Sequence, residues 1–183
     1  MSTARLTWTK LLLTSALALC LMLTSVLPAQ ARLMEETLAS GELLHKSLRS
    51  LQDNHGYSWQ LIAFKTESEP LAYLRLVGFP AIPSIDHQAP LLVQAAGTQI
   101  GVQIAVPDQT PRFGAAAPPP TVAQYPLASI LNPLSRPAAV TLFIPNRPSR
   151  RDSPSELHIP KSIVREWQAI LKCELETCSF DRA

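Results

Sequence analysis

Cysteine is scarce in this chain, with three residues among 183: Cys20, Cys173 and Cys178. So few cysteines exclude a disulfide-rich scaffold, and a domain of about 150 residues buries enough core without one. Cys173 and Cys178 have no histidine or third cysteine nearby in the sequence, which disfavours a metal site, and they are too far apart for a redox motif. We predict that Cys173 and Cys178 form a disulfide bond that pins the end of the last helix to the C-terminal tail.

Sequence motifs for cofactors, metals and nucleophilic catalysis are missing. The six glycines form no phosphate-binding loop and no Gly-x-Ser-x-Gly elbow. The four histidines lie in no His-x-His or His-Glu-x-x-His motif, and no carboxylates have the spacing of a calcium loop. We therefore expect no cofactor, no bound metal and no catalytic residue.

The first 31 residues have the pattern of a secretory signal peptide. Arg5 and Lys10 give a positive start, residues 11–27 form an apolar run, and Ala29-Gln30-Ala31 is a small-x-small cleavage site. We predict cleavage before Arg32 and export of the mature chain.

Two alternatives to cleavage are disfavoured. A transmembrane anchor needs about 20 apolar residues, whereas this run has 17 and contains serines and threonines. A lipid anchor on Cys20 would need a small residue where Leu19 stands. We expect no stable membrane anchor after cleavage.

The mature chain lacks an excess of charge of either sign. Loss of Arg5 and Lys10 with the leader leaves fourteen basic residues against fourteen acidic ones. Only Arg147, Arg150 and Arg151 form a local basic cluster, in a turn rich in proline and serine that is typical of a solvated loop. A neutral chain of this kind has no electrostatic footprint for nucleic acid, so we expect no nucleic-acid partner.

A periodicity of two, the spacing of β-strands, dominates the mature chain. The turn residues 53–56 separate two alternating segments, which predicts a hairpin with Trp59, Leu61 and Ala63 on one face and Ile62 and Phe64 on the other. Further strands are expected over 71–79, 91–95, 99–106, 139–144 and 156–159. A turn of helix is expected over 125–131.

The clearest helix comes last. Pro160 suits its first turn, and the apolar residues that follow recur at helical spacing on one stripe. We expect this stripe to pack on the sheet, with Trp167 in the core. Its members are Ile163, Val164, Trp167, Ile170 and Leu171.

Sequential strands joined by short turns are usually antiparallel. We therefore expect one α+β domain over residues 32–183, mainly antiparallel β. It would be a curled sheet or partly open barrel of about seven strands packed against the C-terminal amphipathic helix. The proline-rich stretch 107–124 is expected to be an extended surface loop.

One loop is the candidate functional segment. Asp86 and His87 lie between prolines, and Arg75 is the only charge inside the strand 71–79, where we expect it to be exposed or paired. Ser84, Asp86 and His87 could supply the groups of a hydrolytic triad, although neighbouring positions seldom give the geometry that a triad needs. Alternatively the imidazole fixes the loop by bonding to the backbone.

Several segments together resemble a known family. They are 48–53 (LRSLQD), Trp59-Gln60, 74–80 (LRLVGFP), Asp86-His87 and Glu166-Trp167-Gln168. In this order and spacing they are similar to small exported cyanobacterial proteins grouped as domain-of-unknown-function family 3122. The resemblance implies a cyanobacterial source and a place in the thylakoid lumen or periplasm. It implies no activity, cofactor or catalytic residue.

Three functions remain open. The first is a non-enzymatic accessory or binding protein of the lumen or periplasm, with a membrane protein complex as partner. The second is a carrier of a small apolar ligand such as a pigment or lipid, and the third is a hydrolase that uses His87. A cavity lined by Trp59, Phe64 and Phe79 would favour the carrier. A convergent Ser/His/Asp set would favour the hydrolase. A filled core with an exposed apolar patch would favour the accessory protein.

Overall fold

The structure is a computed structural model that describes residues 33–79, 84–95, 97–104, 119–134, 136–146 and 154–173. All of these belong to one compact unit, Ala31–Ala183, and the remaining unit is Met1–Gln30. The predicted signal peptide over 1–31 and the basic cluster at 147–151 therefore lie outside the described residues. So does Cys178, and the disulfide to Cys173 stays a prediction.

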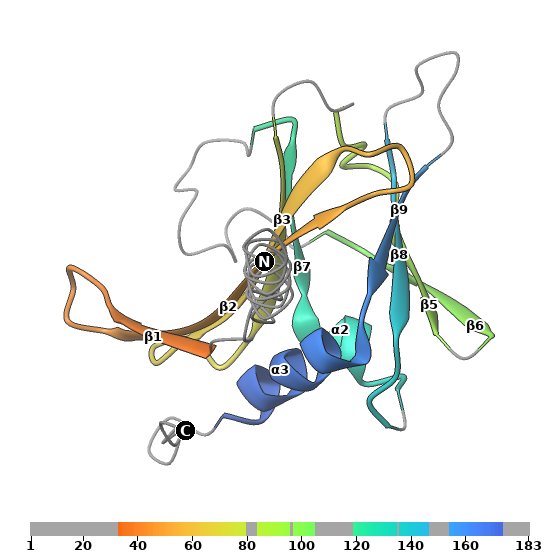
Figure 1. Ribbon diagram of the computed structural model, residues 1–183. Helices are drawn as coiled ribbons and strands as arrows, with labels where there is room; N and C mark the ends of the chain where they lie inside the picture. The colour runs from red at the N-terminus through yellow and green to blue at the C-terminus, as the bar shows by residue number, and fades with distance from the viewer. Residues whose placement is uncertain are drawn as a thin grey trace, which may run out of the picture. The chain divides into compact units, whose positions relative to one another are not determined.

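Two open antiparallel sheets form the framework of this unit (Figure 1). The first has the order β1-β2-β3-β4-β7, with bounds Leu33–Thr37, Leu43–Gln52, Ser58–Thr66, Tyr73–Gly78 and Val122–Pro126. The second has the order β6-β5-β8-β9, with bounds Thr98–Val102, Leu91–Ala95, Val140–Ile144 and Ser155–Ile159. Two helices within the described residues accompany them, α2 over Leu127–Leu131 and α3 over Lys161–Lys172.

This arrangement confirms a mainly antiparallel β fold with a C-terminal helix and corrects its shape. The expected curled sheet or partly open barrel of about seven strands is wrong, because nine described strands divide between two open sheets. The physical reason is a pairing between strands distant in the sequence. The strand β7 pairs with β4, so the intervening β5 and β6 cannot add to that edge and instead pair with β8 in the second sheet.

The same pairing corrects the loop predicted over 107–124. Residues Val122–Pro126 form β7, whose register sets Arg75 opposite Gln124 and Leu76 opposite Ala123. The loop prediction failed there because this strand is short and is preceded by proline-rich sequence. The part of that loop before residue 119 lies outside the described residues.

The main core is shared by both sheets and both helices. Trp59, Leu61 and Ala63, which the hairpin pattern placed on one face of the strand, are all buried in it. The stripe of α3 enters the same core, and Trp167 and Val164 are fully buried. The helix therefore packs as expected, against β2, β3 and α2.

The first hairpin turn ties the two sheets together. Asn54 N donates to Glu156 O of β9 at 3.1 Å, and Glu156 N donates to Asn54 Oδ1 at 2.9 Å. The turn closes at Gly56, whose φ of 81° lies in the left-handed region that glycine adopts without strain. The turn residues that the sequence pattern indicated thus also form hydrogen bonds to a strand that is distant in the sequence.

Candidate functional site

The structure places the predicted loop residues Asp86 and His87 in backbone contacts. His87 Nε2 lies 3.0 Å from Val122 O, and Asp86 Oδ1 accepts a hydrogen bond from Gln88 N at 3.0 Å. Asp86 N also donates to Pro145 O at 2.7 Å. These are the contacts of residues that fix a loop between the sheets, and they give the hydrolase hypothesis no support.

Arg75 lies elsewhere, on the outer face of the first sheet. Its guanidinium donates to Gln124 Oε1 at 3.1 and 2.7 Å and stands over the ring of Phe64, 5.1 Å from the centroid. The side chain is therefore paired, as predicted. It lines a shallow groove of about 240 Å³, the outer groove, whose other residues are Leu44, Lys46, Leu48, Gln60, Ile62 and Phe64.

The three aromatic residues whose common cavity would have favoured a carrier do not meet. Trp59 is fully buried in the main core, and Phe64 belongs to a small separate cluster with Leu44 and Tyr73. Phe79 is 43% exposed. A carrier site, if this fold has one, must be built from other residues.

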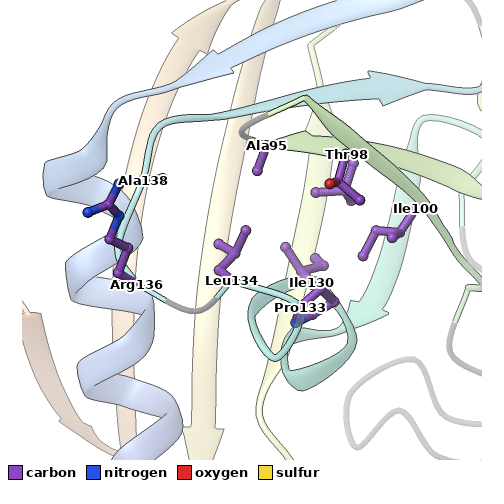
Figure 2. A pocket seen from close by; sticks show the side chains of 9 residues that line it. Ala95, Thr98, Ile100, Ile130, Pro133, Leu134, Arg136 and Ala138 are labelled. Carbon is purple, nitrogen blue, oxygen red and sulfur yellow. The ribbon is translucent and has the colours of Figure 1, made fainter.

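Such a site lies between the β5–β6 hairpin and the segment that contains α2 (Figure 2). One face of the hairpin supplies two cross-strand pairs, Val93 with Ile100 and Ala95 with Thr98. Figure 2 shows Ile130, Pro133 and Leu134 on the opposite side. We call this cavity of about 300 Å³ the hairpin pocket; its lining is Val93, Ala95, Thr98, Ile100, Ile130, Pro133, Leu134, Arg136 and Ala138.

The chemistry of the hairpin pocket is apolar with a polar margin. Val93 and Ile130 are buried, whereas Thr98 and Arg136 are exposed. A concave apolar site with a few polar groups at its margin is the usual form of a small-molecule site, and its volume is at the lower end of the roughly 300–1,000 Å³ found for such sites. It can hold a small apolar group and exclude water from it.

A second cavity of about 300 Å³ adjoins the first, because Leu134 and Arg136 line both. We call it the basic pocket. It lies between the segment after α2 and the last turns of α3, and its polar side chains are Asn132, Arg136, Gln168 and Lys172.

Sequence reasoning missed both pockets. The strands expected over 91–95 and 99–106 are observed as β5 and β6, but no local pattern indicates that Ile130, Pro133 and Leu134 lie opposite their hairpin. Arg136 and Lys172 belong to no motif, so nothing in the sequence marked them.

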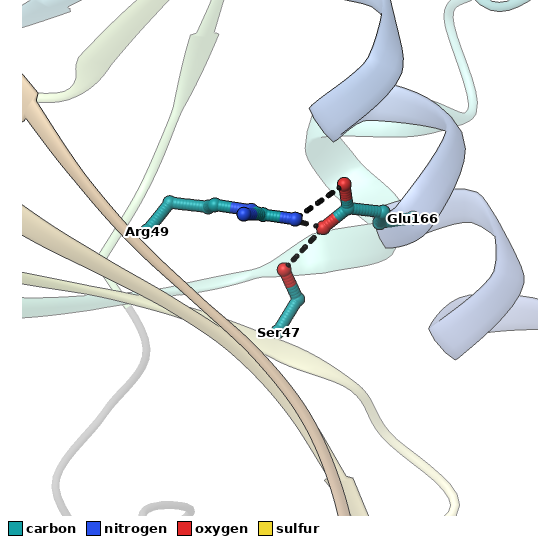
Figure 3. Close-up of polar contacts among 3 residues, drawn as sticks. All are labelled: Ser47, Arg49 and Glu166. Atoms are coloured by element: carbon teal, nitrogen blue, oxygen red, sulfur yellow. Dashed lines mark hydrogen bonds and ion pairs between the residues drawn. The ribbon is translucent and has the colours of Figure 1, made fainter. Parts of the chain in front are cut away.

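A buried polar cluster fixes α3 on the first sheet (Figure 3). Ser47 Oγ donates to Glu166 Oε2 at 2.8 Å, and Arg49 Nη2 donates to Glu166 Oε1 at 2.8 Å. A second bond runs from Arg49 Nε to Oε2 at 3.2 Å. All three side chains are largely buried, so the carboxylate is satisfied on both oxygens and positions the helix that borders the basic pocket.

Within the part of the chain that the structure describes, no three His, Cys, Asp or Glu side chains lie close enough to hold a metal ion. No helix of the described residues is long and apolar enough to cross a membrane.

The comparison with known families shows which family the chain belongs to. The model of the family described as "Protein of unknown function (DUF3122)" matches residues 30–170. The chain belongs to the DUF3122 family. No curated protein and no solved structure matches it.

The family match covers almost all of the described residues. Both walls of the hairpin pocket and the Ser47–Arg49–Glu166 cluster lie inside the DUF3122 region, whereas Lys172 lies just beyond its end. The family description adds no activity to this geometry.

Proposed function

We propose that this chain is a non-enzymatic binding protein that takes up a small apolar molecule, of the pigment or lipid class, in the hairpin pocket. The observation that carries the proposal is a concave apolar cavity of about 300 Å³ between the β5–β6 hairpin and the segment after α2. An apolar group that enters it leaves water, which contributes about 25 cal/mol for each Å² of apolar surface removed.

The position of the pocket supports this use. Its inner wall consists of side chains anchored in the main core, Val93 and Ile130, so that wall is held by the packing of both sheets and of α2. Its outer margin consists of exposed residues, so a ligand can enter without opening the core. A preformed wall lowers the cost of ordering the site on binding.

The test uses a neutral apolar fluorophore, N-phenyl-1-naphthylamine, and the chain from Arg32 to Ala183. We expect saturable binding with increased fluorescence, and loss of most of that binding in Ile100→Glu, which places a charge on the apolar wall. Gln99→Glu is the matched control, since Gln99 neighbours Ile100 on β6 but does not line the pocket. Absence of saturable binding, or equal effects of the two variants, would overturn the proposal.

The proposed compartment is outside the cytoplasm, in the thylakoid lumen or periplasm of a cyanobacterium. The support is the signal-peptide pattern of residues 1–31 together with the family resemblance. A carrier in such a compartment would move or store a molecule that dissolves poorly in water.

A second candidate function is that of an accessory protein that docks on a membrane protein complex. The outer groove favours it, because Leu48 is 40% exposed and apolar side chains line the groove beside Arg75. A tagged chain would be used to capture partners from solubilised membranes. We expect Leu48→Glu to abolish capture and Ser50→Glu, on the same strand outside the groove, to leave it unchanged; equal capture by both variants would contradict this function.

A further inference from the structure

The hairpin pocket and the basic pocket adjoin each other. Leu134 and Arg136 line both, so the apolar wall of the first lies beside the polar side chains of the second. In Figure 2 the Arg136 guanidinium points toward α3 and away from Ile130. An occupant that extended from the first pocket into the second would meet apolar side chains first and cations afterwards.

No described residue that lines the basic pocket carries a negative charge. Neither Arg136 nor Lys172 forms a described salt bridge, and no acidic residue is among the described residues that line the cavity. Asn132 and Gln168 add amide donors. Two like charges in one cavity repel each other, and an anion between them would relieve that repulsion.

The end of α3 brings charges of both signs to this cavity. A helix C-terminus carries roughly half a negative charge, and the carbonyl of Cys173 accepts a hydrogen bond from Lys65 Nζ at 2.7 Å, which adds a cation. The balance of charge is positive and favours an anion. A carboxylate offers two oxygens that the Arg136 guanidinium can bind in parallel.

We propose that the ligand is a single-chain amphiphile with a carboxylate headgroup, whose chain occupies the hairpin pocket and whose carboxylate binds Arg136 and Lys172. This inference rests on the proposed function and adds the class of ligand to it. The Arg136 guanidinium can donate two parallel hydrogen bonds to a carboxylate, and Lys172 can add a third. The cations thus select the headgroup, while the apolar wall supplies affinity for the chain.

The experiment compares three probes with alkyl chains of nine or ten carbons: decanoate, 1-decanol and decyltrimethylammonium. Each displaces N-phenyl-1-naphthylamine from the chain from Arg32 to Ala183. We expect decanoate to bind about tenfold more tightly than decanol, the cationic probe to bind most weakly, and the advantage of decanoate to shrink in high salt.

Charge-removing variants locate the headgroup. Arg136→Gln and Lys172→Gln should each weaken decanoate binding by about fivefold to tenfold and leave decanol binding unchanged. The matched control is Arg165→Gln, because Arg165 is an exposed cation of α3 that lines neither pocket. All three sites are exposed, and a thermal melt confirms that each variant is folded.

The outcomes separate this inference from the proposed function. Equal binding of decanoate and decanol, with no effect of either glutamine variant, would refute the carboxylate site and leave the apolar carrier standing. If none of the three probes displaces the fluorophore, or the fluorophore itself does not bind, the carrier function fails and the headgroup site fails with it.

Discussion

At the residue scale, Asp53 satisfies several donors at once. Its Oδ1 accepts from His55 N and Tyr57 N, both at 2.9 Å, and its Oδ2 accepts from Trp59 Nε1 at 3.0 Å. Burial alone would raise the pKa of this carboxyl, but the hydrogen bonds from Trp59, Ser155 and the two backbone groups outweigh it and lower the pKa below its ordinary value of 3.8. Asp53 therefore holds the turn that joins the two sheets.

This lowered pKa predicts how stability depends on pH. The stabilisation by Asp53 is fully present above about pH 3.8 and is lost as the pH falls through the lower pKa of the folded state. We expect Asp53→Asn to lower the free energy of unfolding by about 2 kcal/mol at pH 7 and by clearly less at pH 3. Denaturant titrations at both pH values measure the difference.

The control for that measurement is Asp86→Asn, since Asp86 accepts one hydrogen bond from its own loop. Asp86→Asn should lower the free energy of unfolding at pH 7 by less than Asp53→Asn does. An equal destabilisation by Asp53→Asn at pH 7 and pH 3 would show that its ionisation does not contribute.

Glu166 and Arg49 give a second prediction at this scale. Glu166→Ala leaves the largely buried Arg49 without its carboxylate, and we expect a loss of about 2–3 kcal/mol in the free energy of unfolding. A double-mutant cycle with Arg49→Ala should give a coupling of about 1–3 kcal/mol. The more exposed pair of Lys46 and Glu36 should give a coupling of less than about 1 kcal/mol. A Glu166–Arg49 coupling no larger than the coupling of Lys46 and Glu36 would contradict the cluster.

At the scale of the element, α3 joins packing and polar contacts on one helix. Its stripe buries Trp167, whose Nε1 has no hydrogen-bond partner within the described part of the chain, while the neighbouring Glu166 is fully bonded. The indole thus contributes by its apolar area and volume, and its N–H group detracts from stability.

We therefore expect Trp167→Ala to lower the free energy of unfolding by about 3–5 kcal/mol and the melting temperature by roughly 10 °C or more. Trp167→Phe keeps most of the volume and removes the unbonded N–H, so it should cost less than about 1.5 kcal/mol. His87→Ala, which removes one contact to the backbone, should cost about 1 kcal/mol. Thermal melts of the three variants test this order of stability losses. If Trp167→Ala melted at the wild-type temperature, the indole would lie outside the core.

At the scale of the whole molecule, both sheets and both helices share one core. Side chains from β3, β5, β8 and α3 meet in it although they are far apart in the sequence. The pockets form at its margin, where the β5–β6 hairpin and the segment after α2 diverge. Binding at the hairpin pocket therefore depends on elements that only the complete fold brings together.

Export is the prediction that concerns the whole chain. Cleavage after Ala31 should give a mature protein that begins at Arg32, because the apolar run is short and ends in a small-x-small site. The intact mass of the protein isolated from a cyanobacterial host measures this. A mass that includes Met1 and the full leader would mean that residues 1–31 stay attached and serve as an anchor.

The sequence by itself determined the local structure and the family. Alternation predicted β2, β3 and the hairpin between them, apolar segments predicted β4 and β5, and helical spacing predicted α3 with Trp167 inside, because these patterns depend on neighbours along the chain. The position of a charge inside an apolar strand predicted that Arg75 is exposed or paired. The ordered segments from 48 to 168 indicated the family that the comparison then showed.

Only the tertiary structure decided the division into two sheets and the position of the candidate site. A strand pattern shows that one face is buried but not which element buries it, so neither the pairing of β4 with β7 nor the covering of Val93 by Ile130 and Leu134 could be read locally. The sequence pattern likewise does not show which charged residues lie close together in the fold. Arg136 and Lys172 are 36 positions apart in the sequence, and they line one pocket because α3 packs beside the segment after α2.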